Sequence, residues 1–365
     1  MKSVATLFFM NAGRYMVGVL LSAVLLVCTF SAPLPALGED GGGSGYKLGE
    51  GIKLWNTGLR LGGYVILEYE DAKHEEAYFK LDDLSFFVFG DISKRWTFFS
   101  EIEDEDPVKV PMKGKSTSHE NWQIERLYAD YLYSDNLTVR VGKFLTPVGT
   151  WNEIHAAPLV WTTSRPAVTF APFPEFITGV QLLGEFTAGD EEFSYSATFQ
   201  NNESINERTG YRRTHIYYGG RIRWLASPRL EIGVPAAYYV EYEVDDKVYL
   251  TGLDLTWKGR SMEVRGEATY GHVKLYRGGH SREYGYYLQG VYDITEKLSL
   301  IGRHEYMRAR DDAGDYKAFT FGAAYKPRPP IVFKIEYQTR SGSLELEEDE
   351  GVEDDRFLAS FSILL

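Results

Sequence analysis

The side chains with the clearest chemical potential in this sequence are arginines that alternate with apolar residues along short segments. Successive side chains of a strand point to opposite faces, so arginines spaced in this way share the polar face of their segment. A row of such cations facing water could bind or steer anions. The candidates are Arg126, Arg140, Arg221, Arg223, Arg265 and Arg303.

One group of arginines is denser than the rest. It consists of Arg212, Arg213, Arg221 and Arg223, with no acidic residue from the first to the last. Guanidinium groups gathered in this way attract anions. Elsewhere the plainer interpretation is a solvated wall of ion pairs, because Arg265 is followed two residues later by Glu267 and Arg303 by Glu305.

Residues 143–176 form the stretch that the rest of the chain must position. They hold five of the 14 prolines, namely Pro147, Pro158, Pro166, Pro172 and Pro174. Proline cannot donate to a sheet ladder, so this stretch is not an ordinary strand. A connection of this length inside a compact fold is more often functional than idle. Lys143, Glu153 and Arg165, three of its charged residues, are therefore candidates for a constriction.

Catalytic and metal-binding patterns are not evident in this sequence. It has no Gly-x-Ser-x-Gly elbow, phosphate loop, zinc motif or calcium loop, and its seven histidines stand at no ligand spacing. Glu153 and His155 could form an acid–base pair, but two such residues in a loop are more often a coincidence. We therefore expect no enzyme activity, no catalytic residue, no cofactor and no metal.

The N-terminus predicts export from the cytoplasm. Lys2 and Arg14 precede an apolar run over 17–27, and Pro33 with Pro35 stop that run short of a membrane-spanning helix. Residues 1–38 are predicted to be a secretory signal peptide and 39–56 a flexible, glycine-rich leader. The single cysteine, Cys28, leaves with the signal. The remaining chain is acidic, which argues against a nucleic-acid partner.

Sixteen short segments alternate apolar and polar residues after the leader. They are 57–70, 78–91, 94–103, 122–133, 136–143, 176–187, 192–201, 213–225, 229–242, 247–257, 261–275, 282–294, 297–308, 316–326, 331–340 and 356–365. Brief turns such as 226–228 alternate with long charged connections such as 105–121, 202–212 and 341–355. Pro235 interrupts one segment and calls for a bulge or a sheet edge.

This pattern predicts an all-β fold. The expected structure is a transmembrane, antiparallel, up-and-down β-barrel of about 16 strands over residues 57–365, located in the cell outer membrane. Short turns at one rim, long loops at the other, and aromatic residues near strand ends are typical of that class. Residues 143–176 are predicted to fold into the lumen as a constriction loop.

Two sequence motifs also carry a family resemblance. Val-Gly-Lys-Phe-Leu-Thr-Pro-Val-Gly-Thr-Trp-Asn-Glu (141–153) and Val-Trp-Thr-Thr-Ser-Arg-Pro (160–166) resemble the pattern of phosphate-selective porins O and P of Gram-negative bacteria. The resemblance implies a sixteen-stranded homotrimeric channel whose third long loop enters the lumen. It places Lys143 and Arg165 at basic motif positions, and Trp151, Trp161 and Phe173 as residues that pin the loop to the wall.

The resulting hypothesis is a porin for passive diffusion of small hydrophilic solutes, with a preference for anions. Its partners would be outer-membrane lipid, the solutes and two further copies of the chain, with no nucleic acid. Two alternatives remain open: a structural or adhesive barrel with long acidic loops, and a channel for hydrophobic solutes. A lumen blocked by Tyr64, Tyr128, Tyr217 and Tyr287 would favour the adhesive barrel.

Overall fold

A computed structural model describes residues 50–154, 156–202, 204–205, 212–242, 244–310, 313–344 and 355–365. The predicted signal peptide, most of the predicted leader and His155 lie outside these residues. Among the residues described, no helix is long and apolar enough to cross a membrane.

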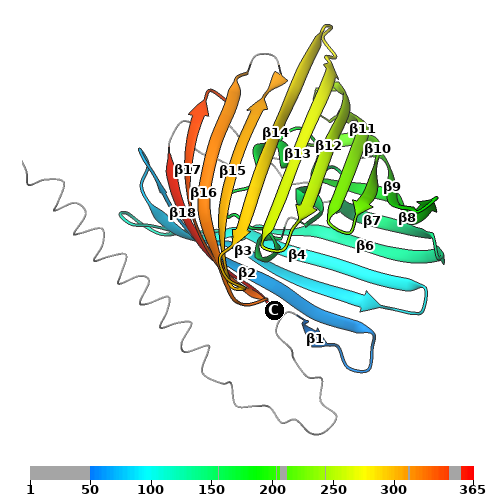
Figure 1. Cartoon of the computed structure of the whole chain (residues 1–365), viewed down its shortest axis with the longest axis horizontal. Helices are drawn as coiled ribbons and strands as arrows, with labels where there is room; N and C mark the ends of the chain where they lie inside the picture. The colour runs from blue at the N-terminus through cyan, green and yellow to red at the C-terminus, as the bar shows by residue number, and fades with distance from the viewer. Residues whose placement is uncertain are drawn as a thin grey trace, which may run out of the picture. The chain divides into compact units, whose positions relative to one another are not determined.

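Strands dominate the described chain (Figure 1). Their bounds are β1 Ile52–Lys53, β2 Leu59–Ala72, β3 Tyr78–Asp91, β4 Trp96–Pro111, β5 Thr117–Ser118, β6 Trp122–Ser134, β7 Leu137–Leu145, β8 Phe176–Ala188, β9 Glu191–Asn201, β10 Thr214–Ser227, β11 Leu230–Glu241, β12 Lys247–Lys258, β13 Met262–Lys274, β14 His280–Asp293, β15 Leu298–Arg308, β16 Asp315–Arg328, β17 Ile331–Gly342 and β18 Arg356–Leu364. Three short helices, α2 Trp151–Ile154, η1 Ala157–Leu159 and η2 Ala167–Thr169, interrupt them.

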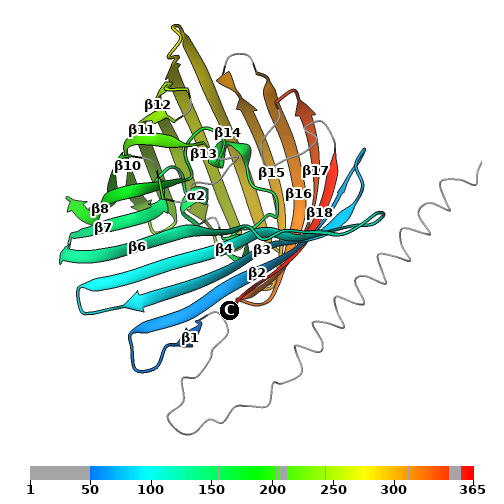
Figure 2. The ribbon, with the colours of Figure 1, turned by 180° about the vertical axis from the view of Figure 1, so that it is seen from behind.

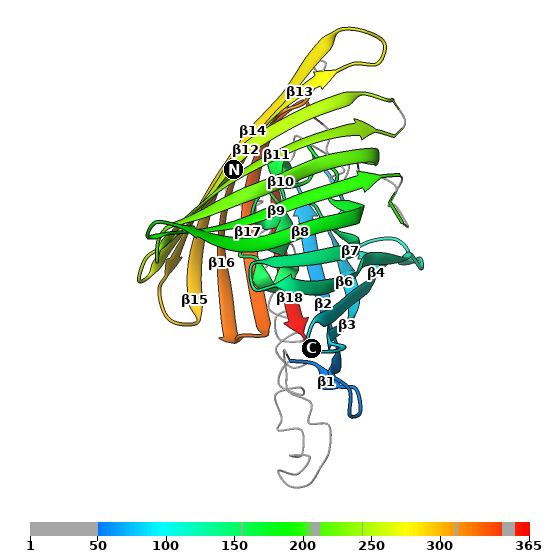
Figure 3. The same ribbon diagram turned by 90° about the vertical axis from the view of Figure 1, so that its right-hand side faces the viewer.

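The long strands close into one antiparallel barrel. Each pairs with the next long strand along the chain, and β18 pairs with β2 to complete the ring. Figure 3 shows the neighbouring strands β8 to β13 side by side in one wall. The two-residue strands β1 and β5 add to β2 and β4 without changing the closure. The predicted barrel of about 16 strands is confirmed.

The alternation of residues separates two surfaces. Outward positions carry exposed apolar side chains, such as Leu288 at 56% and Phe321 at 64% exposure. Inward positions carry buried polar side chains such as Glu305 and Gln338. This polarity is the reverse of a water-soluble protein, and a barrel acquires it because lipid meets one face of each strand and the lumen meets the other.

One predicted strand boundary was wrong. Segment 94–103 continues as β4 to Pro111, and most of the connection predicted over 105–121 is a hairpin extension stabilised by β5. The alternation in fact continues, because Val108 and Val110 are exposed on either side of the less exposed Lys109. The many charged residues of this stretch obscured the alternation of apolar and polar residues that is typical of a strand.

Pro235 is accommodated without a bulge or an edge. It lies in β11, pairs with Arg221 of β10, and leaves a gap in the pairing with β12 between Gly233 and Ala236. The register is the same on both sides of the gap. A Cβ at Gly252 would approach the Pro235 ring to 3.1 Å, so glycine provides the space that the ring needs.

Candidate functional site: the inner loop and the lumen wall

Residues 146–175, here called the inner loop, connect the neighbouring strands β7 and β8. The loop nevertheless reaches the opposite wall, where η2 contacts β14 and β15 and η1 contacts β18. Figure 2 shows α2 and the adjoining chain within the ring of strands. Its prolines exclude it from the ladder, so it is free to leave the sheet and cross the interior.

Wall carboxylates hold the inner loop by its backbone. Glu267 of β13 accepts a hydrogen bond from the Trp151 N–H at 2.7 Å. Across the lumen, the two oxygens of Glu336 in β17 accept from the N–H groups of Thr163 and Ser164 at 3.0 and 2.9 Å. A carboxylate that accepts two backbone N–H bonds fixes the direction of the chain at that point.

Arg303 of β15 is the cationic counterpart of these carboxylates. Its guanidinium donates to the Ser164 carbonyl at 2.8 Å and to the Thr162 and Ser164 hydroxyls at 2.7 Å. Glu305, 3.0 Å from Arg303, also accepts from the Ala167 N–H at 2.9 Å. Both side chains are buried, so this predicted lumen charge anchors the loop and does not face open water.

Lys334 of β17 completes the anchorage at the far wall. Its Nζ donates to the carbonyls of Ala157 and Thr162 at 2.7 and 3.1 Å. A single ammonium thus ties two turns of the inner loop together. The wall therefore binds the loop mainly through main-chain atoms.

The inner loop covers only part of the dense arginine group. Arg221 of β10 is buried, donates to the Gly149 carbonyl at 3.0 Å and to Glu153 at 2.8 Å, and is ion-paired with Asp254. Arg223, two residues further, is 38% exposed and lies 3.5 Å from the same Glu153. One arginine holds the loop and the other faces water.

Arg212 lies at the long-loop rim, apart from the lumen arginines. It donates to Glu241 at 2.6 Å and to Glu283 at 3.0 Å. Burial lowers the pKa of Arg212, but the carboxylates of Glu283 and Glu241 outweigh that effect and raise the pKa well above its ordinary value. Arg310, which the sequence analysis did not single out, shares Glu241 at 2.7 Å.

Arg165 organises the inner loop from within. It donates to Glu175 at 2.5 Å, to the Asn152 amide oxygen at 3.0 Å and to the Thr169 carbonyl at 2.8 Å. These partners come from the beginning, middle and end of the loop. Its geometry fits a clamp that keeps the loop compact.

Lys143 lies in the wall next to the inner loop. It is 2% exposed, and its Nζ donates to the Ile124 carbonyl at 2.7 Å. Its place in the constriction stays a prediction, although this burial favours anchoring over contact with a solute. Glu153 is the more open candidate, with a side chain that is 28% exposed.

Arg126 and Arg140 line the part of the wall formed by β6 and β7. Arg126 is 16% exposed and pairs at 2.5 Å with the buried Glu101. Arg140 makes a two-bond pair with Asp130 at 2.8 and 2.9 Å and stacks over Tyr128 at 3.9 Å. These arginines retain access to water while their positions are fixed.

Arg265 belongs to β13, a wall strand that η2 of the inner loop contacts. It pairs at 2.8 Å with Glu263, which also accepts from the Trp161 indole N–H at 3.0 Å. Lys326 stacks over the Trp161 ring at 3.8 Å. Trp161 is thus fixed to the wall by polar groups on both its edge and its face.

Aromatic residues pack the inner loop against the wall. Trp151 contacts the buried Tyr287, and Phe173 clusters with Tyr217. Tyr64 packs near Ala156 in the same way. These tyrosines are covered by the loop and therefore do not form a plug of their own. Tyr128 is only partly buried.

Comparisons with known proteins agree with this geometry. Residues 87–365 match the model of the family described as "Putative beta-barrel porin-2, OmpL-like". A protein of Aquifex aeolicus described as uncharacterized is 24% identical over 338 residues, covering 77% of this chain and 75% of that protein.

Solved outer-membrane barrels share the fold at low sequence identity. The anion-selective porin of Comamonas acidovorans has a TM-score of 0.59 at 11% identity, covering 84% of this chain and 99% of its own. The outer membrane channel DcaP of Acinetobacter baumannii has a TM-score of 0.56 at 15% identity, with 88% and 100% covered. OmpT of Vibrio cholerae, in its trimer form, gives 0.59 at 10% identity, with 84% and 99% covered.

Proposed function

Since this chain belongs to the OmpL-like beta-barrel porin-2 family, and is thus an outer-membrane barrel of porin type, we propose that it is a passive diffusion channel for small hydrophilic solutes. Transport through such a channel needs no catalytic residue and no cofactor. Selection depends on the width and charge of the narrowest point. Selectivity for phosphate, which the resemblance of the sequence motifs implied, is a narrower version of this proposal.

The inner loop is the observation that carries the proposal. It crosses the lumen and is bonded to the far wall through Glu336, Arg303 and Lys334. A loop held at both ends and in the middle would narrow the barrel to a fixed width. A barrel that served only as a scaffold or an adhesin would not need this anchorage.

A preference for anions is supported by the unequal exposure of paired charges. In the pairs Arg126 with Glu101 and Arg140 with Asp130, the arginine side chain is the more exposed partner, at 16% against 0% and 22% against 18%. Arg310 likewise exceeds Glu241 at the rim, at 23% against 6%. At these three pairs water meets more of the arginine than of its partner, which supports a weak preference for anions. At Arg221 with Glu153 and at Arg265 with Glu263 the carboxylate is the more exposed partner.

Planar-bilayer recording of the refolded protein tests this function. A porin gives discrete current steps, and a salt gradient then gives a reversal potential of the sign that indicates anion flow. An adhesive barrel gives no steps. A channel for hydrophobic solutes gives no uptake of hydrophilic sugars in liposome swelling. Either of the last two results would refute the proposal.

We also propose that the chain assembles as a homotrimer. The exposed apolar belt offers a surface on which copies can pack, and the Vibrio cholerae barrel of the same fold is described in a trimer form. Light scattering coupled to gel filtration in detergent measures the protein mass of the complex. A mass of one chain would contradict the trimer without affecting the channel proposal.

A further inference from the structure

A basic patch lies on the outer surface of the barrel at the long-loop rim. It consists of His272, Lys274, His280, Arg282 and Arg308. Cross-strand pairing places Lys274 opposite His280 and His272 opposite Arg282. The two imidazole rings stack with centroids 5.0 Å apart. None of these side chains points into the lumen, because they alternate with the buried, inward residues Val273, Glu283 and Met307 of the same three strands.

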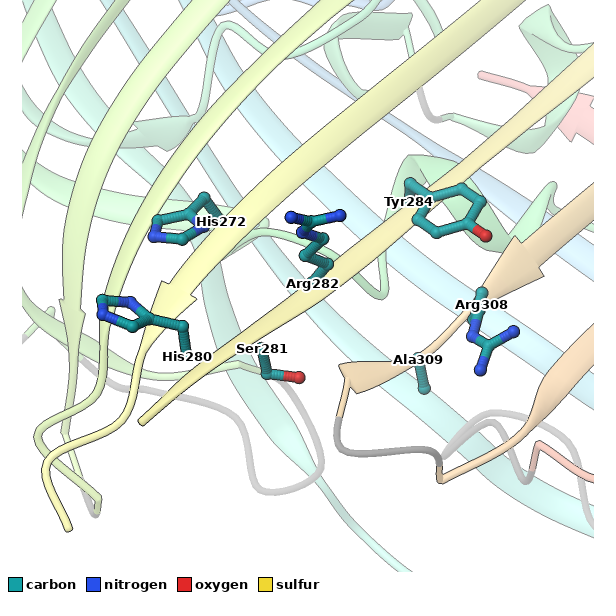
Figure 4. A pocket seen from close by; sticks show the side chains of 7 residues that line it. All are labelled: His272, His280, Ser281, Arg282, Tyr284, Arg308 and Ala309. Atoms are coloured by element: carbon teal, nitrogen blue, oxygen red, sulfur yellow. The ribbon is translucent and has the colours of Figure 1, made fainter. Parts of the chain in front are cut away.

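The patch surrounds a hollow created by unequal strand lengths. Arg308, the last residue of β15, pairs with Tyr284, so β14 runs on to His280 beyond the end of its neighbour. The β13–β14 hairpin therefore rises above β15 (Figure 1). Figure 4 shows the side chains of His272, His280, Arg282 and Arg308 around the resulting hollow, which has a volume of about 570 Å³.

Aromatic residues just below the patch indicate its depth in the membrane. Tyr270, Tyr284 and Tyr306 form a continuous outward band with ring centroids 6.5 and 6.1 Å apart. Tyrosines of this kind mark the interface between hydrocarbon and headgroups. Arg282 is two residues above Tyr284 in β14, so the basic patch lies at headgroup height in the outer leaflet.

The arginines are suitably placed for a phosphate group. Arg282 and Arg308 are diagonal neighbours on one outer face, which brings their Cα atoms to about 7–8 Å. Arg282 makes no hydrogen bond or ion pair within the described part of the chain. Arg308 lies directly opposite Asp315 in the pairing of β15 with β16, and Asp315 also pairs at 3.1 Å with Lys317. Two guanidinium groups at this spacing can share the oxygens of one phosphate.

We propose that this basic patch binds the phosphorylated headgroup of an outer-leaflet glycolipid. Arg282 and Arg308 contact the phosphate, His272 and His280 donate hydrogen bonds to the adjoining sugar, and the tyrosine band supports the acyl chains. The ligand is a lipid and not free phosphate, because His272, His280, Arg282 and Arg308 line the hollow from the outward register of their strands, above exposed residues such as Tyr284 and Leu288. This inference concerns the outer wall and is independent of what passes through the lumen.

Native mass spectrometry of the full chain in detergent, titrated with lipid A, tests the proposal. The charge-reversing variant Arg282→Glu/Arg308→Glu should bind at least about tenfold more weakly, because two attractive contacts become repulsive. The matched control Lys94→Glu/Lys297→Glu reverses two exposed charges at the opposite rim and should bind as the unmodified chain does. The neutral variant Arg282→Gln/Arg308→Gln should be intermediate.

Two further arms identify the ligand chemistry. Lipid A stripped of its phosphates should lose the arginine-dependent part of the affinity, and inorganic phosphate should compete only at much higher concentration. Unchanged gel mobility before and after heating shows that each variant is folded. Equal binding by the charge-reversing variant and the control would overturn the proposal. So would equal binding of the dephosphorylated lipid, while competition by phosphate at matched concentration would replace the lipid with a free anion.

Discussion

At the residue scale, two arginines on the same face of one strand have different environments and different roles. Arg221 and Arg223 share one face of β10, and the sequence alternation predicts both in the lumen. The structure places both inward, but the inner loop covers the first and leaves the second 38% exposed. Strand parity reveals which way a side chain points. It cannot reveal what covers that side chain, because the inner loop has no repeating pattern from which its path could be predicted.

This division predicts opposite outcomes for two substitutions. Arg223→Glu should shift the reversal potential toward cations with conductance little changed, because only an exposed charge is reversed. Arg221→Met should instead alter conductance and increase current noise, because the loop loses its bonds at Gly149 and Glu153. Single-channel recording in a salt gradient measures both. Equal shifts in selectivity for the two variants would contradict the distinction.

Arg303 should make a large contribution to stability. Arg303→Met leaves Glu305 as an uncompensated buried charge, at a cost of about 3–5 kcal/mol. Lys317→Met is the matched control, since its exposed pair with Asp315 contributes about 0–1 kcal/mol. Urea unfolding in lipid vesicles compares the two variants. A loss no greater than that of the control would show that the loop is not anchored through Arg303.

At the element scale, strands could be predicted more fully than the loop between them. All sixteen predicted segments correspond to strands, because the lipid and lumen faces impose a two-residue period on each. The extension of β4 to Pro111 and the accommodation of Pro235 were not predicted. Both depend on partners in neighbouring strands, such as β5 and Gly252, which a local pattern does not contain.

Strand β7, which leads into the inner loop, requires a glycine at position 142. Gly142 has φ of +136°, and a Cβ there would lie 2.1 Å from the Leu127 carbonyl oxygen. Gly142→Ala should therefore destabilise the barrel by about 1–3 kcal/mol or shift β7 locally. Gly290→Ala in β14 is the control, because its Cβ would have no atom within 4 Å. Thermal unfolding followed by gel mobility distinguishes them, and similar midpoints would contradict the strain.

At the scale of the whole molecule, an acidic chain encloses a lumen in which the arginine is the more exposed member of some ion pairs, such as Arg126 with Glu101. We therefore expect the local arrangement of charges, and not the net charge of −13, to set the selectivity of the proposed channel. Arg126 illustrates this arrangement, because its side chain is 16% exposed while its partner Glu101 is fully buried.

Selectivity that arises from partly exposed charges should weaken as salt rises. The screening length falls from about 10 Å at 0.1 M to about 3 Å at 1 M. The anion-to-cation permeability ratio should therefore approach one at high salt, measured from reversal potentials at a fixed concentration ratio. The variant Arg126→Gln/Arg140→Gln/Arg223→Gln should begin nearer to one and change less. A ratio independent of salt would exclude these arginines as its source.

The wall holds the inner loop through peptide groups at Gly149, Trp151, Ser164 and Ala167. A peptide group is common to every amino acid, so the attachment makes little demand on which side chains the loop presents to passing molecules. Exposed loop positions can thus be exchanged to retune permeability while the frame stays intact. To change the permeability of the proposed channel, one should substitute exposed residues of the inner loop and retain the wall residues that bind its peptide groups.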